Sequence, residues 1–310
     1  MADLVRTSFR FDSPVLGDLE IPRFDVRGGG GPSLALIAGV HGCEYSSIAA
    51  VGDVVRALEA EDLAGRVIAI PVVNGTGFAT RTPFVTPEDG KNLNRCFPGR
   101  PDGTYSEALA HHVFGVISDC DYLIDLHGGD LVEALEPFVL YDESPVEDSA
   151  RAMAKAFGLP YAICSPRAER IEGTTVAAAS DAGIPAIVAE AGGRGLLDDG
   201  ARRALAGGVL NVMRSVGLLS AMPEPTAGTT VFRRFAWLYS TAEGWWEPGV
   251  EVGEAIEAGS VVGTVRTVLG EEIERIVAAD AGVVLFMTSV PAVLENGVLM
   301  GIGVDGAPLG

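Results

Sequence analysis

Three apolar runs in this sequence each lead into side chains that can bind a metal ion or move a proton. SLALIAGV leads into His41-Gly-Cys-Glu44, YLIDL leads into His127, and IPAIVA leads into Glu190. Because ligands and reactive groups collect beyond the carboxyl ends of strands in open α/β sheets, these three ends are predicted to form one site. Two His and one Glu make a zinc set that leaves a position open for water, and a further Glu can take a proton from that water.

The predicted metal ligands are His41, Glu44 and His127, which would hold one Zn²⁺ per chain. The H-x-x-E spacing places the first two on one side of a helix start, close enough to share an ion. Asp125 points the same way as His127 along a strand, so its carboxylate can orient a neighbouring ligand. Each of these side chains could instead be structural, capping a strand or facing solvent. Cys43 lies in the same segment, but the zinc set is complete without it.

Other polar residues suit the substrate and the proton transfer. Glu190 ends an apolar run, so loss of solvation is expected to raise the pKa of its carboxyl toward that of a general base. Residues 74–103 form a segment rich in Gly, Pro and Asn, and a loop of that length inside a compact domain is usually functional or disordered. It carries Asn94 and Arg95, which suit a carboxylate, and Arg81, which can stabilise charge on a carbonyl oxygen.

Alternating strand and helix patterns must position these residues. The candidate strands are residues 33–40, 66–73, 121–127, 136–141, 160–164 and 184–190, and the candidate helices are about 45–60, 104–118, 146–157, 173–182 and 198–216. The strands are nearly continuous apolar runs, as expected for strands covered on both faces. The prediction is an α/β catalytic domain over residues 1–221, with a mixed sheet flanked by helices, followed by a small all-β domain over residues 229–310.

The composition narrows the classes of partner. The 310 residues carry a net charge of −20, which argues against binding to nucleic acid or to anionic membranes. No apolar run reaches the roughly 18 residues needed to span a bilayer, and the first residues lack a signal-peptide pattern, so the predicted location is cytoplasmic. The expected partner is a small-molecule substrate. Whether the chain forms a homo-oligomer is left open.

Four motifs occur together in this chain: HGCE, NLNR-x-FPG, DLHGG and AEAGG. In order and spacing they resemble the succinylglutamate desuccinylase/aspartoacylase family, a branch of the zinc carboxypeptidase fold. The resemblance covers most of residues 30–200 and implies zinc bound by His41, Glu44 and His127, with Glu190 as the general base. The implied activity is deacylation of a small N-acyl amino acid, as in bacterial members that include deacetylases of N-acetylated diamino acids.

The same resemblance implies roles for the polar residues of the substrate site. Asn94 and Arg95 would bind the substrate's carboxylate, and Arg81 would polarise the scissile carbonyl. Two departures from the family pattern concern the substrate: Ser180 stands where aspartoacylases carry a second arginine, and Tyr239 is a candidate for a tyrosine that some members contribute from the C-terminal domain. Three other arginines could replace the missing one: Arg167, Arg170 and Arg194.

Two rival functions remain at this point. A metallocarboxypeptidase could use the same residues on peptides, and a catalytically idle zinc-binding protein would hold the metal without turnover. The C-terminal region resembles the barrel-sandwich modules of lipoyl and biotin carriers. However, residues 229–310 contain no lysine, which excludes a swinging-arm role.

Overall fold

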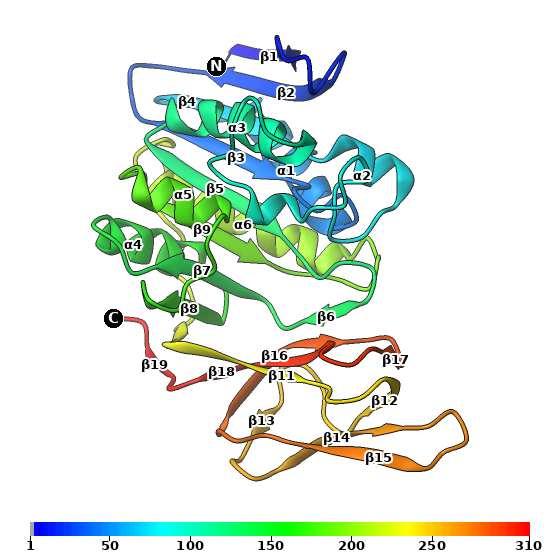
Figure 1. Cartoon of the computed structure of the whole chain (residues 1–310). Helices are drawn as coiled ribbons and strands as arrows, with labels where there is room; N and C mark the ends of the chain where they lie inside the picture. The colour runs from blue at the N-terminus through cyan, green and yellow to red at the C-terminus, as the bar shows by residue number, and fades with distance from the viewer. Residues whose placement is uncertain (1–2) are drawn as a thin grey trace.

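The structure is a computed structural model that describes residues 3–310, and a mixed ten-stranded sheet runs through this part of the chain (Figure 1). In spatial order its strands are β1 (Asp3–Arg10), β2 (Glu20–Arg27), β4 (Arg66–Ile70), β3 (Ser33–Ala38), β5 (Tyr122–His127), β9 (Ala186–Glu190), β7 (Phe138–Asp142), β8 (Tyr161–Ser165), β10 (Thr230–Phe232) and β19 (Ala307–Pro308). The central strands β4, β3, β5 and β9 are parallel, and β7 is antiparallel to β9. The predicted α/β architecture with a mixed sheet is confirmed.

Helices cover both faces of this sheet, which explains why its central strands are apolar on both sides. One face packs against α1 (Tyr45–Leu58), α4 (Glu147–Phe157) and α6 (Asp199–Ser215). The other face packs against α3 (Tyr105–Ser118) and α5 (Thr175–Asp181). These strands and helices lie close to the predicted bounds. No helix within residues 3–310 has both the length and the apolar character needed to cross a membrane.

Several elements lie outside the predicted set. β1 and β2 pair as an antiparallel hairpin at one edge of the large sheet, and most side chains of β1 face solvent. Their sequences, DLVRTSFR and EIPRFDVR, mix charged and apolar residues and so contain no continuous apolar run. The long segment 74–103 also contains a short helix, α2 (Gly75–Thr80), and a 3₁₀ turn, η1 (Leu93–Arg95).

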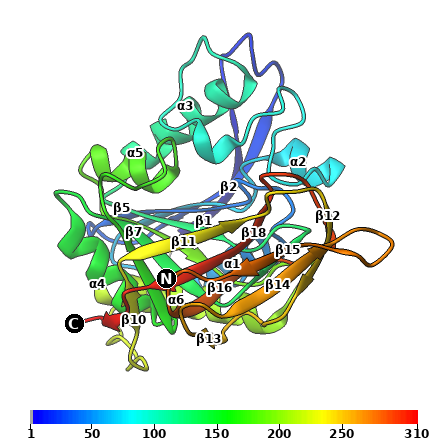
Figure 2. The ribbon, with the colours of Figure 1, turned by 60° about the horizontal axis from the view of Figure 1, so that its bottom comes forward.

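The C-terminal region is built of strands, as predicted, and lies beside the β7–β8 part of the large sheet (Figure 1). One sheet contains β11 (Arg234–Tyr239), β18 (Val298–Val304), β16 (Gly282–Thr288) and β13 (Ala255–Ile256), with β6 (Glu133–Leu135) also paired to β16. A second contains β15 (Glu272–Val277), β14 (Val261–Arg266), β12 (Gly244–Pro248) and β17 (Ala292–Val293). Figure 2 shows β11, β18 and β16 side by side.

Strands cross the predicted domain boundary in both directions. β10 and β19 come from the C-terminal region, yet they extend the large sheet beyond β8. In return, β6 from the α/β region pairs with β16 in the C-terminal sheet. The two regions are therefore joined by backbone hydrogen bonds as well as by the chain connection near residue 228.

Two neighbouring glycines in α6 test the packing of this helix against α4. A Cβ atom at Gly208 would overlap the buried ring of Phe157, whereas Gly207 is exposed and a Cβ atom there meets nothing within 4 Å. We expect Gly208→Ala to lower the free energy of unfolding by about 1–2 kcal/mol because a packed core must shift. Gly207→Ala should raise the free energy of unfolding by about 0.5–1 kcal/mol. Urea denaturation of both variants measures the difference, and equal effects would contradict the packing described.

Candidate active site

The carboxyl ends of three neighbouring parallel strands form the centre of the site. β3 and β9 lie on either side of β5, so the segments that follow the three strands meet at one edge. His127 and Glu190 are the last residues of β5 and β9, and they are direct partners in the strand register. His41 follows β3, and Glu44 forms the N-cap of α1. The sheet order thus brings together the three strand ends singled out in the sequence.

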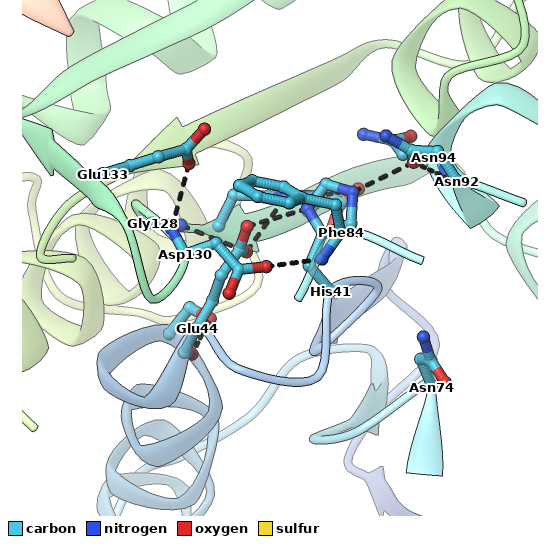
Figure 3. Close-up of polar contacts among 12 residues, drawn as sticks. His41, Glu44, Asn74, Phe84, Asn92, Asn94, Gly128, Asp130 and Glu133 are labelled. Atoms are coloured by element: carbon cyan, nitrogen blue, oxygen red, sulfur yellow. Dashed lines mark hydrogen bonds and ion pairs between the residues drawn. The ribbon is translucent and has the colours of Figure 1, made fainter. Parts of the chain in front are cut away.

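His41, Glu44 and His127 converge on a common point. The Glu44 carboxylate lies between the two rings, with Oε1 2.7 Å from Nδ1 of His41 and Oε2 3.0 Å from Nδ1 of His127. One ligand atom from each residue lies within 4.8 Å of the others. Figure 3 shows the Glu44 side chain reaching from the start of α1 toward His41. This spacing suits a single metal ion.

The charge on Glu44 also suits a metal ligand. Burial alone would raise the pKa of its carboxyl, but the neighbouring rings of His127 and His41 outweigh that effect and hold the pKa at about 2. Glu44 is therefore ionised at neutral pH. Its Oε2 also accepts a hydrogen bond from the Gly128 amide at 3.2 Å, which fixes the carboxylate against the end of β5.

Outer partners hold the second nitrogen of each histidine ring. Nε2 of His41 lies 3.1 Å from Oδ1 of Asn92, and Nε2 of His127 lies 3.0 Å from Oδ2 of Asp125. Asp125 is fully buried and accepts a further hydrogen bond from the Thr175 hydroxyl. Such partners fix the tautomer and the orientation of a ring that binds a metal through its other nitrogen.

Two further carboxyl groups lie beside the three converging residues. Burial raises the pKa of Glu190 well above its ordinary value, although the His127 ring opposes the effect. Burial also raises the pKa of Glu133 to about 7, while its Oε2 accepts a hydrogen bond from the Asp130 amide. A carboxyl whose pKa is raised by an apolar environment can both accept and donate a proton near neutral pH.

A cleft of about 330 Å³ opens in front of these groups, within the size range of small-molecule sites. His41, Glu44, His127, Glu133 and Glu190 line one end of it. The middle is apolar, with side chains from β7, β8, β9, β11 and β16. The C-terminal region therefore contributes part of the cleft wall.

Two of the predicted substrate-binding residues line this cleft, namely Asn94 and Arg95. Asn94 is buried, and its Oδ1 accepts a hydrogen bond from the Thr175 amide at 3.1 Å, which orients the side chain. Arg95 donates to the Asn94 carbonyl at 2.6 Å and forms no ion pair with any residue in the described range 3–310. Its guanidinium is therefore available to a carboxylate.

The other predicted substrate residues lie outside the cleft lining. Arg81 is exposed at the end of α2, where it adopts a left-handed backbone conformation with φ of 56°. Tyr239 ends β11 and is 50% exposed. Of the three alternative arginines, Arg167 and Arg170 pair with Asp181, and Arg194 borders a separate pocket. The cleft lining formed by residues 3–310 includes none of these three arginines.

Sequence reasoning missed several residues that do line the cleft. They are Phe84, Glu133, Asp142, Arg233, Arg234, Trp237 and Phe286. Asp142 ends β7, but this strand runs antiparallel to β9, so its carboxyl end lies away from the edge formed by His127 and Glu190, and the strand-end rule does not find it. Trp237 and Phe286 belong to C-terminal strands, and no local pattern indicates that they face the α/β region.

Comparison with known proteins bears directly on this site. Residues 30–216 match the succinylglutamate desuccinylase/aspartoacylase catalytic domain. The chain belongs to this family. The family predicted from the four motifs is thus confirmed. Over 156 residues the chain is 40% identical to the N-alpha-acetyl-L-2,4-diaminobutyric acid deacetylase of Halomonas elongata. The matched stretch covers 49% of this chain and 45% of the relative. The chain thus spans less than half the length of that curated relative.

Two solved structures share the whole fold of this chain. A succinylglutamate desuccinylase/aspartoacylase from Rhodobacter sphaeroides is 26% identical, with a TM-score of 0.84 over 99% of this chain and 95% of that one. The product-bound ectoine utilization protein EutE (DoeB) from Ruegeria pomeroyi is 23% identical, with a TM-score of 0.85 over 98% of this chain and 95% of that one. The similarity extends through the C-terminal strands as well as the catalytic domain.

Proposed function

We propose that this member of the desuccinylase/aspartoacylase family is a zinc-dependent hydrolase that cleaves the amide bond of a small N-acyl amino acid. The observation that carries the proposal is the convergence of His41, Glu44 and His127 beside Glu190 in the lining of one cleft. The names of its relatives, a diaminobutyric acid deacetylase and a desuccinylase/aspartoacylase, support the same class of reaction.

The three proposed ligands fit a zinc ion by their chemistry. Two imidazoles and one ionised carboxylate are a common catalytic zinc set, and the outer partners Asn92 and Asp125 orient the rings. When bound there, zinc supplies a Lewis acid that polarises a carbonyl and lowers the pKa of a water molecule.

The protein's own residues supply the remaining steps. In the proposal Glu190 accepts a proton from the attacking water and later donates it to the nitrogen of the leaving amine. Its raised pKa supports both transfers, because the carboxyl then holds a proton readily near neutral pH. Asn94 and Arg95 hold the carboxylate of the substrate through an amide and a guanidinium. Both residues line the same cleft as Glu190, which supports this role.

The C-terminal strands are proposed to form a barrel-sandwich module that closes the cleft. β11 and β16 contribute Trp237 and Phe286 to its lining, so these strands help to exclude water from the reacting end. This role would explain why the chain needs the region even though every proposed zinc ligand lies before it.

The proposal is tested by hydrolysis of a panel of N-acetyl and N-succinyl amino acids with protein of measured zinc content. Amine release that stops with a chelator and returns with zinc is the expected result. Extension of the free amino acid by one residue to a dipeptide should reduce turnover, whereas a carboxypeptidase would retain it. Stoichiometric zinc with no release from any substrate would refute the hydrolase.

Arg81 remains proposed as the group that stabilises charge on the carbonyl oxygen, which requires the segment after α2 to close on the bound substrate. We expect Arg81→Met to lower kcat by about tenfold to a hundredfold with little change in KM, because the contact would form only in the transition state. Steady-state kinetics with Arg100→Met as an exposed control measures this. Unchanged kcat would leave Arg81 outside the reaction.

Tyr239 is proposed to contact only those substrates that extend past the cleft mouth.

A further inference from the structure

The cleft continues well beyond the proposed reacting end, along one face of the large sheet. Phe138, Leu140 and Asp142 alternate along β7, so their side chains share this face, and all three line the cleft. Phe138 is the register partner of Glu190, and Asp142 lies four residues further along the strand. At about 3.3 Å per residue, roughly 13 Å of strand separates the level of the Glu190 carboxyl group from that of the Asp142 carboxyl group.

Apolar side chains from several elements line this channel between its two ends. Its floor includes Leu140 and Ile163 from β7 and β8, which are register partners. Trp237 and Phe286 cover it from the C-terminal strands, and Val176 from α5 adds a third wall. A channel of this kind favours an extended hydrocarbon part of a ligand, because burial of each methylene group is favourable.

The far end of the channel is acidic and incompletely paired. Asp142 is only 5% exposed, and its Oδ2 has no hydrogen-bond partner among residues 3–310. The nearby Arg170 is engaged elsewhere: its guanidinium nitrogens donate to Glu172 and Asp181, and no hydrogen bond joins it to Asp142. Burial raises the pKa of Asp142 to about 6, with Arg170 partly opposing the shift, so the carboxyl is still mostly ionised at neutral pH.

Besides Asp142, the far end of the channel has both negatively and positively charged side chains. Glu169 lines the channel and adds a second carboxylate, while Arg234 is paired with Asp280 at 2.9 Å. Arg233 also lines the channel but is exposed, so water solvates its guanidinium. The buried, unpaired group is therefore an anion, and a buried carboxylate gains most from a ligand that is cationic and donates hydrogen bonds.

We propose that the cleft accepts an N-acyl amino acid with an extended apolar arm that ends in an ammonium group, and that Asp142 binds this group. The inference rests on the proposed hydrolase function and adds a substrate class to it. Of the roughly 13 Å between the levels of Glu190 and Asp142, a contact of about 3 Å between the ligand and each carboxyl group takes up about 6 Å. Roughly 7 Å then remains for the arm of the ligand, a span of about six bonds. The arm can belong either to the amino acid side chain or to the acyl group, and matched substrates separate these two sources.

The test compares amine-tailed substrates with neutral ones of similar shape. For the side chain, the pair is Nα-acetyl-lysine and Nα-acetyl-norleucine. For the acyl group, the pair is N-(6-aminohexanoyl)glycine and N-hexanoylglycine. We expect kcat/KM to favour the amine in one pair by about tenfold or more, as one charge-assisted hydrogen bond at a buried site provides. Nα-acetyl-2,4-diaminobutyrate is too short to reach Asp142 and should show a smaller advantage.

Two variants then assign the preference to one carboxylate. Asp142→Asn should bring the amine-to-neutral ratio of kcat/KM to within about threefold of one, since the amide keeps the shape but removes the charge. Asp148→Asn removes the same charge from an exposed position on α4 outside the channel, and it should keep the wild-type ratio. The ratio in the unaltered protein stands as a test even if Asp142→Asn fails to fold.

Binding separates this inference from the proposed reaction. Calorimetric titration of the Glu190→Gln protein with each substrate pair measures the same preference without turnover. A preference in binding with no hydrolysis by the unaltered protein would support the subsite and refute the reaction. Hydrolysis with equal rates for amine and neutral substrates, or a preference for Nα-acetyl-2-aminoadipate through Arg233, would overturn the subsite.

Discussion

Glu190→Gln is expected to lower kcat by about 10²- to 10⁴-fold while the zinc content of the protein stays unchanged. The glutamine keeps the shape of the side chain but cannot accept the proton that the attacking water must lose. The raised pKa of Glu190 and its place opposite His127 at the end of β9 motivate this expectation. Steady-state kinetics on the best substrate, together with elemental analysis for zinc, measures both quantities.

Glu133→Gln is the matched control for this variant. Glu133 is a second carboxyl at the same end of the cleft, and burial raises its pKa to about 7, so it is the strongest rival for the role of base. If Glu190 is the base, Glu133→Gln should change kcat by much less than Glu190→Gln. A large loss in the Glu133 variant with near-normal turnover in the Glu190 variant would reverse the assignment.

His127→Ala is expected to abolish stoichiometric zinc binding and, with it, hydrolysis. The substitution removes one of three ligands from a buried site whose remaining groups, His41 and Glu44, cannot close the coordination set. Asp125→Asn should have a smaller effect, weakening zinc affinity by about 10- to 100-fold, because Asp125 acts through the orientation of the His127 ring.

Zinc affinity is measured by competition with a coloured chelator at fixed pH. His111→Ala provides the control, since this histidine is exposed on α3 and lies outside the group that could hold a metal. It should bind zinc as the unaltered protein does. Stoichiometric zinc in His127→Ala would show that the ion binds elsewhere, and an unchanged affinity in Asp125→Asn would remove the orienting role.

Much of the fold could be predicted because the central strands are buried on both faces. Burial on both faces requires a continuous apolar run, which is visible in one sequence, and the helices between the runs follow from their periodicity. The β1–β2 hairpin could not be found in this way, since its outer strand faces solvent and carries polar side chains. β10 and β19 were also missed as parts of the large sheet, because each pairs over only two or three residues with strands distant in the sequence.

In the candidate site, too, residues with a local sequence signal could be predicted, and residues placed by long-range packing could not. The residues at strand ends, such as His127 and Glu190, were predictable because the end of a buried strand is a local signal and parallel strands share one edge. Trp237 and Phe286 were not, since their place in the cleft depends on how two separate regions of the chain pack. Arg81 was chosen for its position in a polar segment, and the left-handed backbone conformation that it adopts at the end of α2, outside the cleft lining, has no sequence signature.

The interlocked strands have a consequence for synthesis of the chain on the ribosome. All proposed zinc ligands and Glu190 emerge early, but β10, which covers the edge of β8, and β16, which pairs with β6, are made afterwards. Until then the nascent protein presents open strand edges and an uncovered apolar channel, features that promote aggregation. A shortened gene product ending near residue 221 should therefore need chaperone protection, and the cleft of the full chain can be completed only after β11 and β16 have been made.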